Sequence, residues 1–249
     1  DRIERFITVA NVITRDNGEL ILAGNRKVLF ARLSDAKFFW NNDLRAINAG
    51  MDVWVTKLEN VTFHNKLGTQ KDRIDRLCLL AVNIASFLEV DVDLTKQAAL
   101  FCKADLSSEM VYEFPELQGV MGSYYAKSSG LNSDVALAIK EHYAPLGPSD
   151  ICPRKPLSVV IALADKIDIL TSFWKINEKP TGSRDPFALR RAALGVIRVL
   201  IENSISLNLR AYFNNDLEPE VSNDLLSFIN DRLTVFLKNE NFRYDAIEA

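Results

Sequence analysis

One long apolar segment, residues 157–174, constrains the fold more than any other stretch of the chain. Its apolar side chains recur all round a helix and leave no wide polar face, which predicts a helix buried on every side. Asp165 and Asp168 lie three residues apart inside it, and therefore on one side of the helix. A buried carboxylate is costly unless it is paired, so both need a partner. Two explanations stay open: hydrogen bonds to neighbouring elements, or descent from a metal site.

A polar loop and a second helix come after this segment. The loop PTGSRDP covers residues 180–186, and its last two residues predict a helix start, with Asp185 as the N-cap and Pro186 at the first helical position. This predicted helix carries Arg198 and Glu202 four residues apart, a spacing at which the two side chains can pair.

The first 33 residues have the pattern of strands. Residues 6–14 are rich in β-branched side chains, residues 16–18 read Asp-Asn-Gly, a tight-turn signal, and residues 19–22 predict the return strand. Residues 28–33 fit either a third strand or the approach to a helix. A β remnant of this size is rarely stable alone, so we expect it to pack on the helices after residue 33 or to belong to another domain.

From residue 34 onward the pattern becomes helical. Periodicity and capping residues predict helices over 35–49, 71–88, from 93 or 95 to about 105, 107–114, 116–127, 135–143, 157–174, from 186, 206–215 and from 222, with 53–67 ambiguous. The fold is therefore predicted to be mainly α. We divide it into a β remnant (1–33), a helical domain (34–215) and a helical segment (216–249) that leads to a missing C-terminal region. The start without Met and the stop inside a helix-like stretch indicate cuts in a longer polypeptide.

Charge and cysteine content exclude several classes of protein. The net charge of -3 gives no overall attraction to nucleic acid, so any RNA contact needs a local basic patch. Three cysteines, far apart in the sequence, indicate a reduced, cytoplasmic protein. No long apolar run is free of charges, so we expect no membrane contact.

The sequence lacks the familiar catalytic motifs. Two histidines, His64 and His142, are too few for a three-histidine metal site. No nucleophile elbow, P-loop or dinucleotide-binding glycine pattern occurs. Cys102 has apolar neighbours in the sequence, which favours a core residue over a nucleophile.

Four helical segments resemble, in their order, the HD phosphohydrolase superfamily: AALFCKADL (98–106), EFPELQG (113–119), AIKEHYAP (138–145) and IALADKIDILTS (161–172). The resemblance implies a helical domain that holds a divalent metal through a histidine, a His-Asp doublet and a distal aspartate. Asp165 matches the distal aspartate, and His142 falls where one branch of the family carries a histidine pair.

The remaining metal positions depart from that family. Arg73 stands where the first histidine is expected, and the doublet reads Cys102-Lys103 or, with a two-residue slip, Ala104-Asp105. A cationic Lys103 would repel a metal ion. We therefore expect a degenerate HD-like cluster without metal, in which Asp165 is paired with Lys103, Arg73 or Lys166. The alternative is an active, metal-dependent HD-type phosphohydrolase.

A second resemblance is more specific. It rests on five blocks: GNRKVLFARLSDAKFFW (24–40), KADLSSEMVYEFPELQGVMGSYYA (103–126), EHYAP (141–145), LADKIDIL (163–170) and PTGSRDPFALRRAALGVIR (180–198). In this order they resemble the β subunit of the bacterial heterotetrameric glycyl-tRNA synthetase, and the chain is similar to the middle of that subunit.

This resemblance implies a supporting role in glycine–tRNA ligation. In that family the α subunit carries the site for glycine and ATP, with Mg, and the β subunit supplies tRNA recognition and holds the α dimer. We therefore expect no catalytic residue, metal or cofactor in this chain. Its expected partners are the α subunit and tRNA-Gly, in a cytoplasmic heterotetramer.

Basic residues around the polar loop are the candidates for RNA contact, because an arginine fork and a helix N-terminus both suit phosphate. They are Lys179, Arg184, Arg190, Arg191 and Arg198. An alternative stays open for Arg190 and Arg191, which would then bond Glu109, Glu113 or Glu116 and hold the fold.

Overall fold

The computed structural model describes residues 4–48, 50–240 and 242 of the chain. Its centre is α8 (Pro156–Lys175), which contacts α3 (Gln70–Phe87), α4 (Val92–Phe101), α7 (Ser133–Glu141), α9 (Leu189–Glu202) and α11 (Pro219–Asn239). All but one of the residues from 157 to 174 are buried, which confirms the predicted buried helix. Within the described residues, no helix is both long and apolar enough to cross a membrane.

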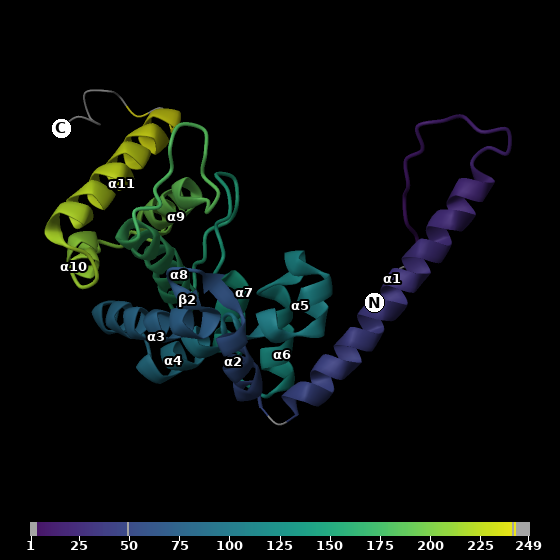
Figure 1. Cartoon of the computed structure of the whole chain (residues 1–249), viewed down its shortest axis with the longest axis horizontal. Helices are drawn as coiled ribbons and strands as arrows, with labels where there is room; N and C mark the ends of the chain where they lie inside the picture. Colours follow the sequence, from purple (N-terminus) through teal and green to yellow (C-terminus); the bar gives the residue numbers. More distant parts are fainter. Residues whose placement is uncertain (1–3, 49, 241, 243–249) are drawn as a thin grey trace.

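Short elements complete the half of the body built on α3 and α4 (Figure 1). They are α2 (Asp52–Lys57), η1 (Leu58–Asn60), η2 (Ala104–Ser107), α5 (Glu109–Glu113), η3 (Pro115–Leu117) and α6 (Val120–Ser128). α6 packs against α7, and α3 packs against α4. Of these four helices, α3, α4 and α7 also contact α8.

Side-chain caps mark where several of these helices begin. Thr69 and Asp72 form a capping box at the start of α3, in which Thr69 Oγ1 accepts from the Asp72 amide at 3.2 Å. Asp91 caps α4, and Asn132 caps α7. The predicted helices over 71–88 and 135–143 therefore lie within two residues of the observed ones.

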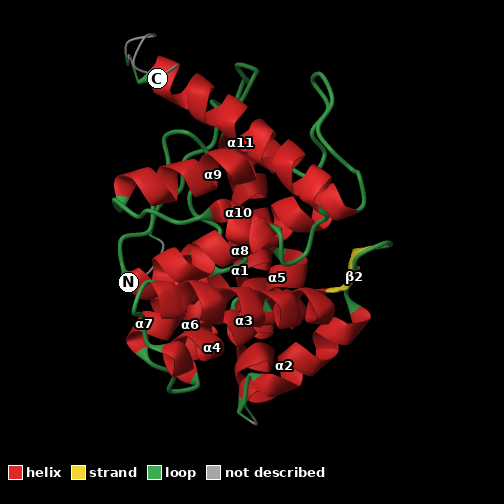
Figure 2. Ribbon diagram, turned by 90° about the vertical axis from the view of Figure 1, so that its left-hand side faces the viewer, coloured by secondary structure: helices red, strands yellow, loops and turns green. Residues whose placement is uncertain are grey.

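The C-terminal half of the chain forms a second group of helices. Figure 2 shows α9, α10 (Leu209–Phe213) and α11 stacked at one end of the molecule. α11 packs on α9 and α8, and the Trp174 indole of α8 donates to Asp224 Oδ2 of α11 at 2.7 Å. The predicted helical character of the chain's last residues concerns 243–249, which lie outside the described residues.

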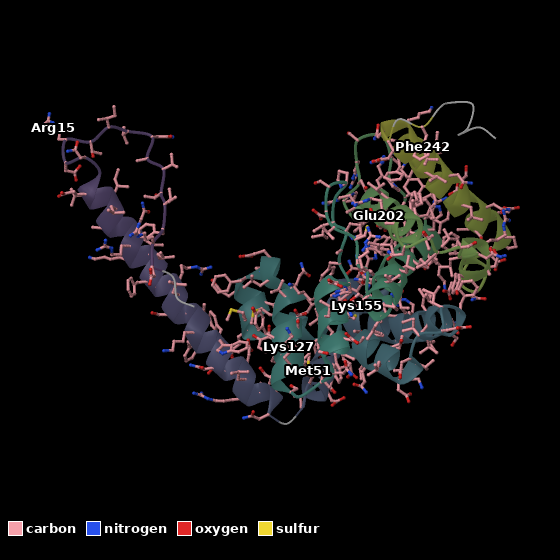
Figure 3. The ribbon with its side chains drawn as sticks, turned by 180° about the vertical axis from the view of Figure 1, so that it is seen from behind. Arg15, Met51, Lys127, Lys155, Glu202 and Phe242 are labelled. Carbon is pink, nitrogen blue, oxygen red and sulfur yellow. The ribbon has the colours of Figure 1, made fainter. Side chains whose placement is uncertain are left out.

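The longest helix, α1 (Glu19–Ile47), leaves the body as an arm (Figure 1). Its C-terminal part packs on α5 and α6, where buried Asp43 accepts from the Tyr125 hydroxyl at 2.6 Å. Figure 3 shows Arg15 at the tip of this arm, far from Phe242 at the other end of the molecule. Residues before α1 run back beside it, with Asn25 donating to Thr8.

The prediction of a mainly α fold with a small β element is confirmed, but the β element lies elsewhere. The sheet of the described residues is an antiparallel hairpin of β1 (Thr62–His64) and β2 (Gly68–Thr69). The strands predicted over 6–14 and 19–22 are wrong: 6–14 form no strand, and 19–22 begin α1. Asp16 explains the error, because its Oδ2 accepts from the Leu20 amide at 2.9 Å and starts a helix where a hairpin turn was expected. The division of the chain into three regions stays a prediction.

Some predicted helix starts are also corrected. Ser34 lies inside α1 because the strong helix formers from residue 19 onward extend the helix beyond it. Ser222 lies inside α11, which begins with Pro219 in its first turn. Asp185 accepts from the amides of Leu189 and Arg190 in the first turn of α9, but it is not the N-cap. That position is Ala188, so Pro186 precedes the helix and α9 begins three residues later than predicted.

Candidate functional site

The carboxylate of Asp165 lies at the centre of a buried ion-pair cluster. Arg73 of α3 donates from Nη2 to its Oδ1 at 2.8 Å, and Lys103, which follows α4, places Nζ 2.8 Å from the same oxygen. Both cations are buried, and Lys103 is 0% exposed. The predicted pairing of Asp165 is therefore confirmed for Arg73 and Lys103.

Asp168 belongs to the same cluster one helical turn along α8. It accepts from Arg73 Nε at 3.1 Å and from Arg76 Nε at 2.8 Å. Arg73 thus spans both carboxylates of the buried helix, which lie on one face as their spacing predicted. Two carboxylates and three cations lock α3 to α8.

Aromatic rings close the cluster on two sides. The Arg73 guanidinium lies over the Phe63 ring at 4.6 Å from its centroid, and the Lys103 ammonium lies over the Tyr143 ring at 3.7 Å. A cation held over a ring face gains attraction where water is excluded. These rings replace part of the hydration that the buried cations have lost.

The cluster shifts the pKa of its ionisable groups. Burial alone would raise the pKa of Asp165, but Lys103 and Arg73 outweigh it and hold that pKa well below its ordinary value. Burial lowers the pKa of Lys103, and the attraction of Asp165 only partly opposes the change. Asp165 is therefore a fixed anion, which is poorly suited to exchange protons in catalysis.

Lys166 points its ammonium away from Asp165 towards backbone carbonyls. Its Nζ donates to the Ala144 oxygen at 2.8 Å and to the Tyr143 oxygen at 3.1 Å. The prediction that Lys166 could pair with Asp165 is not realised as a direct contact, because these carbonyls hold the ammonium. Burial lowers the pKa of Lys166 to about 8.

The other predicted members of the cluster each bond elsewhere. His142 is buried, with Nδ1 2.6 Å from the Ile139 oxygen, and burial holds its pKa well below the ordinary value. The Cys102 thiol donates to the Ala99 oxygen, and burial raises its pKa to about 12. Asp105 accepts from the Gly119 and Gly122 amides at 2.6 and 2.9 Å, so it anchors the start of α6.

These residues do not fit a divalent metal ion. In the part of the chain that the structure describes, no group of three or more His, Cys, Asp and Glu side chains is placed to hold one. The resemblance to HD phosphohydrolases assigns Asp165 to a metal ion, but its carboxylate forms ion pairs with Lys103 and Arg73 instead. We derive no reaction step through a metal.

The basic residues around the polar loop separate into bonded and free side chains. Arg198 is buried: its guanidinium donates to Glu202, to the Gly147 oxygen at 2.8 Å and to the Asp150 oxygen at 2.7 Å. The i,i+4 pairing of Arg198 with Glu202 is thus confirmed. Lys179 lies 2.8 Å from Asp224 of α11.

The basic residues of the loop and of the first turn of α9 also divide into bonded and exposed side chains. Arg190 donates to the Gly182 oxygen at 2.7 Å, whereas Arg184 and Arg191 are exposed. The alternative in which Arg190 and Arg191 bond acidic residues is wrong: Arg190 bonds a backbone oxygen, and among the described residues no acidic side chain pairs with the guanidinium of either arginine.

Two of the acids named there have other partners. Glu109 accepts from Asn42, and Glu113 pairs with Arg32, so both hold the α1 arm to α5. Glu109 and Glu113 are therefore not the groups that position α9.

Sequence reasoning missed Arg76 and the two aromatic rings. Arg76 comes three residues after Arg73 on α3, a spacing that puts both on one side of the helix and could have indicated a second partner for the α8 carboxylates. No sequence signal marks Phe63 or Tyr143, because both come from short segments between helices.

Comparison with known proteins gives one consistent family. Residues 2–249 match the family described as "Glycyl-tRNA synthetase beta subunit". The chain is 60% identical over 250 residues to the glycine–tRNA ligase beta subunit of Ruegeria sp. (strain TM1040), covering 100% of this chain and 36% of that protein. It is 56% identical to that of Paracoccus denitrificans (strain Pd 1222), covering 100% and 36%, and 49% identical to that of Rhodospirillum centenum (strain ATCC 51521 / SW), covering 98% and 35%. The chain thus spans about a third of the length of these relatives.

Proposed function

The chain belongs to the family of glycyl-tRNA synthetase beta subunits, and from this we propose that it works within a glycine–tRNA ligase as a tRNA-binding and scaffolding part, without an aminoacylation site of its own. The proposed partners are tRNA-Gly and a separate α subunit that carries the site for glycine, ATP and Mg, in a cytoplasmic heterotetramer. The curated relatives are named as beta subunits, which supports a partner subunit.

The pairing of both buried carboxylates with basic side chains carries the non-catalytic part of this proposal. Asp165 and Asp168 are each held by two basic side chains at 2.8 to 3.1 Å. Protonating such a carboxylate, or breaking its ion pairs so that it can bind a ligand cation, costs too much free energy. The cluster is better suited to fixing α3 against α8 than to chemistry.

Exposed cations at the start of α9 support the RNA-binding part. Arg184 and Arg191 extend from the loop and the first helical turn, with Arg190 and Lys179 held beside them by their bonds to Gly182 and Asp224. Arginine side chains near a helix N-terminus suit phosphate oxygens. Arg198 is left out of this surface because its donors are already used inside the fold.

The α1 arm supports the scaffolding part. It exposes a set of large apolar side chains: Leu20, Leu22, Val28, Phe30, Leu33 and Phe38. An apolar surface of this kind on a soluble protein marks a contact with another domain or subunit. Most of each curated relative's length lies beyond the stretch that this chain matches.

A charge-reversal experiment tests the RNA contact. In filter binding of tRNA-Gly at several salt concentrations, Arg184→Glu with Arg191→Glu should weaken binding and reduce the slope of log K against log salt by about 2. The matched control is Lys57→Glu with Lys140→Glu, which makes the same charge change at exposed lysines on other helices. Equal weakening by both double variants would reject the proposed surface.

A second experiment tests the absence of an aminoacylation site. The chain alone should show no glycine-dependent pyrophosphate exchange, and turnover of a phosphate ester should be absent in samples supplied with Mn²⁺. Either activity, removed by Asp165→Asn in a folded protein, would overturn the non-catalytic proposal.

A further inference from the structure

A small cavity opens beside the ion-pair cluster, at the N-terminal end of α9. Its volume is about 230 Å³, and its wall is built from α3, α8, α9 and the segment after α7. This is below the usual range of roughly 300–1,000 Å³ for pockets that hold a whole small molecule. The cavity therefore suits one compact chemical group.

The charges in the cavity wall are unbalanced. Arg73, Lys166 and Arg191 line it together with one carboxylate, Asp165. That carboxylate is already paired with Lys103 behind the wall as well as with Arg73, and Arg73 is also held by Asp168, so the surplus positive charge comes from Lys166 and Arg191. The wall thus presents more positive charge than its own acidic group can compensate.

Lys166 is a buried cation of the cavity wall that is held by backbone carbonyls. It is buried, and its ammonium meets only backbone carbonyls, the nearest at 2.8 Å. Carbonyl dipoles satisfy its hydrogen-bond donors but bring no negative charge. An anion in the cavity would supply the missing charge next to a desolvated cation.

Arg191 is placed to complete such a site. It lines the cavity from the first turn of α9 and is exposed, and no hydrogen bond or ion pair occupies its side chain in the described part of the chain. Its neighbour Arg190 is held by the Gly182 oxygen instead. A free guanidinium fork matches two oxygens of a phosphate group better than it matches a spherical anion.

We propose that this cavity is a phosphate-binding site, in which Arg191 contacts the phosphate and the nearby Lys166 and Arg73 supply positive charge. The ligand class is a single phosphate group, either free in solution or carried by RNA. The inference goes beyond the proposed tRNA-binding role, because it assigns a cavity whose binding of inorganic phosphate can be measured without tRNA.

Calorimetric titration of the folded chain with inorganic phosphate tests the proposal, at constant ionic strength set with chloride. Phosphate should bind at one site per chain, and Arg191→Gln should weaken it about tenfold or more, as expected for loss of a charge-assisted contact. The control is Lys57→Gln, which removes an exposed cation of α2, outside both the cavity wall and the proposed RNA surface, and should leave phosphate affinity unchanged. No saturable binding, or equal weakening by the two variants, would overturn the site.

Competition with tRNA separates the two sources of phosphate. If RNA supplies the group, inorganic phosphate should compete with tRNA-Gly and Arg191→Gln should lower the affinity for both. If the ligand is free phosphate, its affinity should be the same with tRNA bound. Both results support the site, whereas tRNA binding without any phosphate binding would reject it and leave the proposed function intact.

Discussion

Lys103 places its ammonium 2.8 Å from Oδ1 of Asp165, although none of its side chain reaches solvent. Lys103 stands where the resemblance to HD phosphohydrolases would place the metal-binding doublet in its most direct register, and its ammonium lies beside the carboxylate there. A bound metal ion can dissociate, whereas the ammonium of Lys103 is covalently attached to the chain. The ion pair links α8 to the segment that follows α4.

The first prediction concerns this link. Asp165→Asn should lower the free energy of unfolding by about 4 kcal/mol, and Lys103→Met by about 3 kcal/mol, because each leaves a buried charge less well paired. The double variant should lose about 2 kcal/mol less than the sum, as measured by urea denaturation. The control cycle uses Lys71 and Asp75, which pair at 2.6 Å on the surface of α3 and should couple by about 0.5 kcal/mol or less. Equal coupling in the two cycles would contradict the buried link.

A second prediction concerns Asp105. Burial raises its pKa to about 6 from the ordinary 3.8, because the charged form loses more from desolvation than it gains from the Gly119 and Gly122 amides. The folded state therefore binds this proton more tightly than the unfolded state, and stability falls as pH rises from about 4 to about 6.

The measurable consequence is a pH-dependent effect of Asp105→Asn. This change removes the titration, so wild type should exceed the variant in unfolding free energy by about 2 kcal/mol more near pH 4.5 than near pH 7.5. Urea denaturation of both proteins across this range checks it, and contributions from other groups cancel in the difference. A difference that stays constant with pH would show that Asp105 does not titrate in this range.

The third prediction uses two glycines in helices. A Cβ built on Gly195 of α9 would lie 2.7 Å from Lys166 Cδ, whereas one on Gly24 of α1 meets nothing within 4 Å. Gly195→Ala should therefore lower the free energy of unfolding by about 1–2 kcal/mol, since overpacking exceeds the gain in helix propensity. Gly24→Ala should cause no loss and up to about 1 kcal/mol of gain. Thermal unfolding followed by circular dichroism compares them, and a stabilising Gly195→Ala would refute the close contact with Lys166.

The ion-pair cluster shows what a sequence can and cannot predict. A carboxylate inside an apolar helix requires a cation, so a partner for Asp165 among few candidates was predictable. The ion pair between Arg76 and Asp168 was not predictable, because it depends on the angle at which α3 crosses α8. Hydrophobic periodicity does not fix that angle. Lys166 was misassigned for the same reason: it comes directly after Asp165, but its direction depends on where the segment after α7 passes.

The α1 arm illustrates a different limit. Asp16-Asn17-Gly18 suits a hairpin turn, but the same aspartate can accept from amides that start a helix. Local chemistry does not distinguish a hairpin turn from a helix start. The two are distinguished by the absence of a strand partner among the described residues nearby. The helix formers after residue 19 then extend α1 without interruption through Ser34.

Arg191 and Arg198 lie seven residues apart on one face of α9, but the segment at Gly147 and Asp150 covers only Arg198. The last prediction separates their roles. Arg198→Lys should lower the free energy of unfolding by about 2 kcal/mol, because one ammonium cannot replace the guanidinium donors that reach these carbonyls and Glu202. It should leave the salt slope of tRNA binding unchanged in protein that is still folded, whereas Arg191→Gln should reduce that slope by about 1 with little change in stability. Urea denaturation and salt-dependent filter binding on the same samples give both values. A reduced slope for Arg198→Lys would return Arg198 to the RNA surface and contradict its structural role.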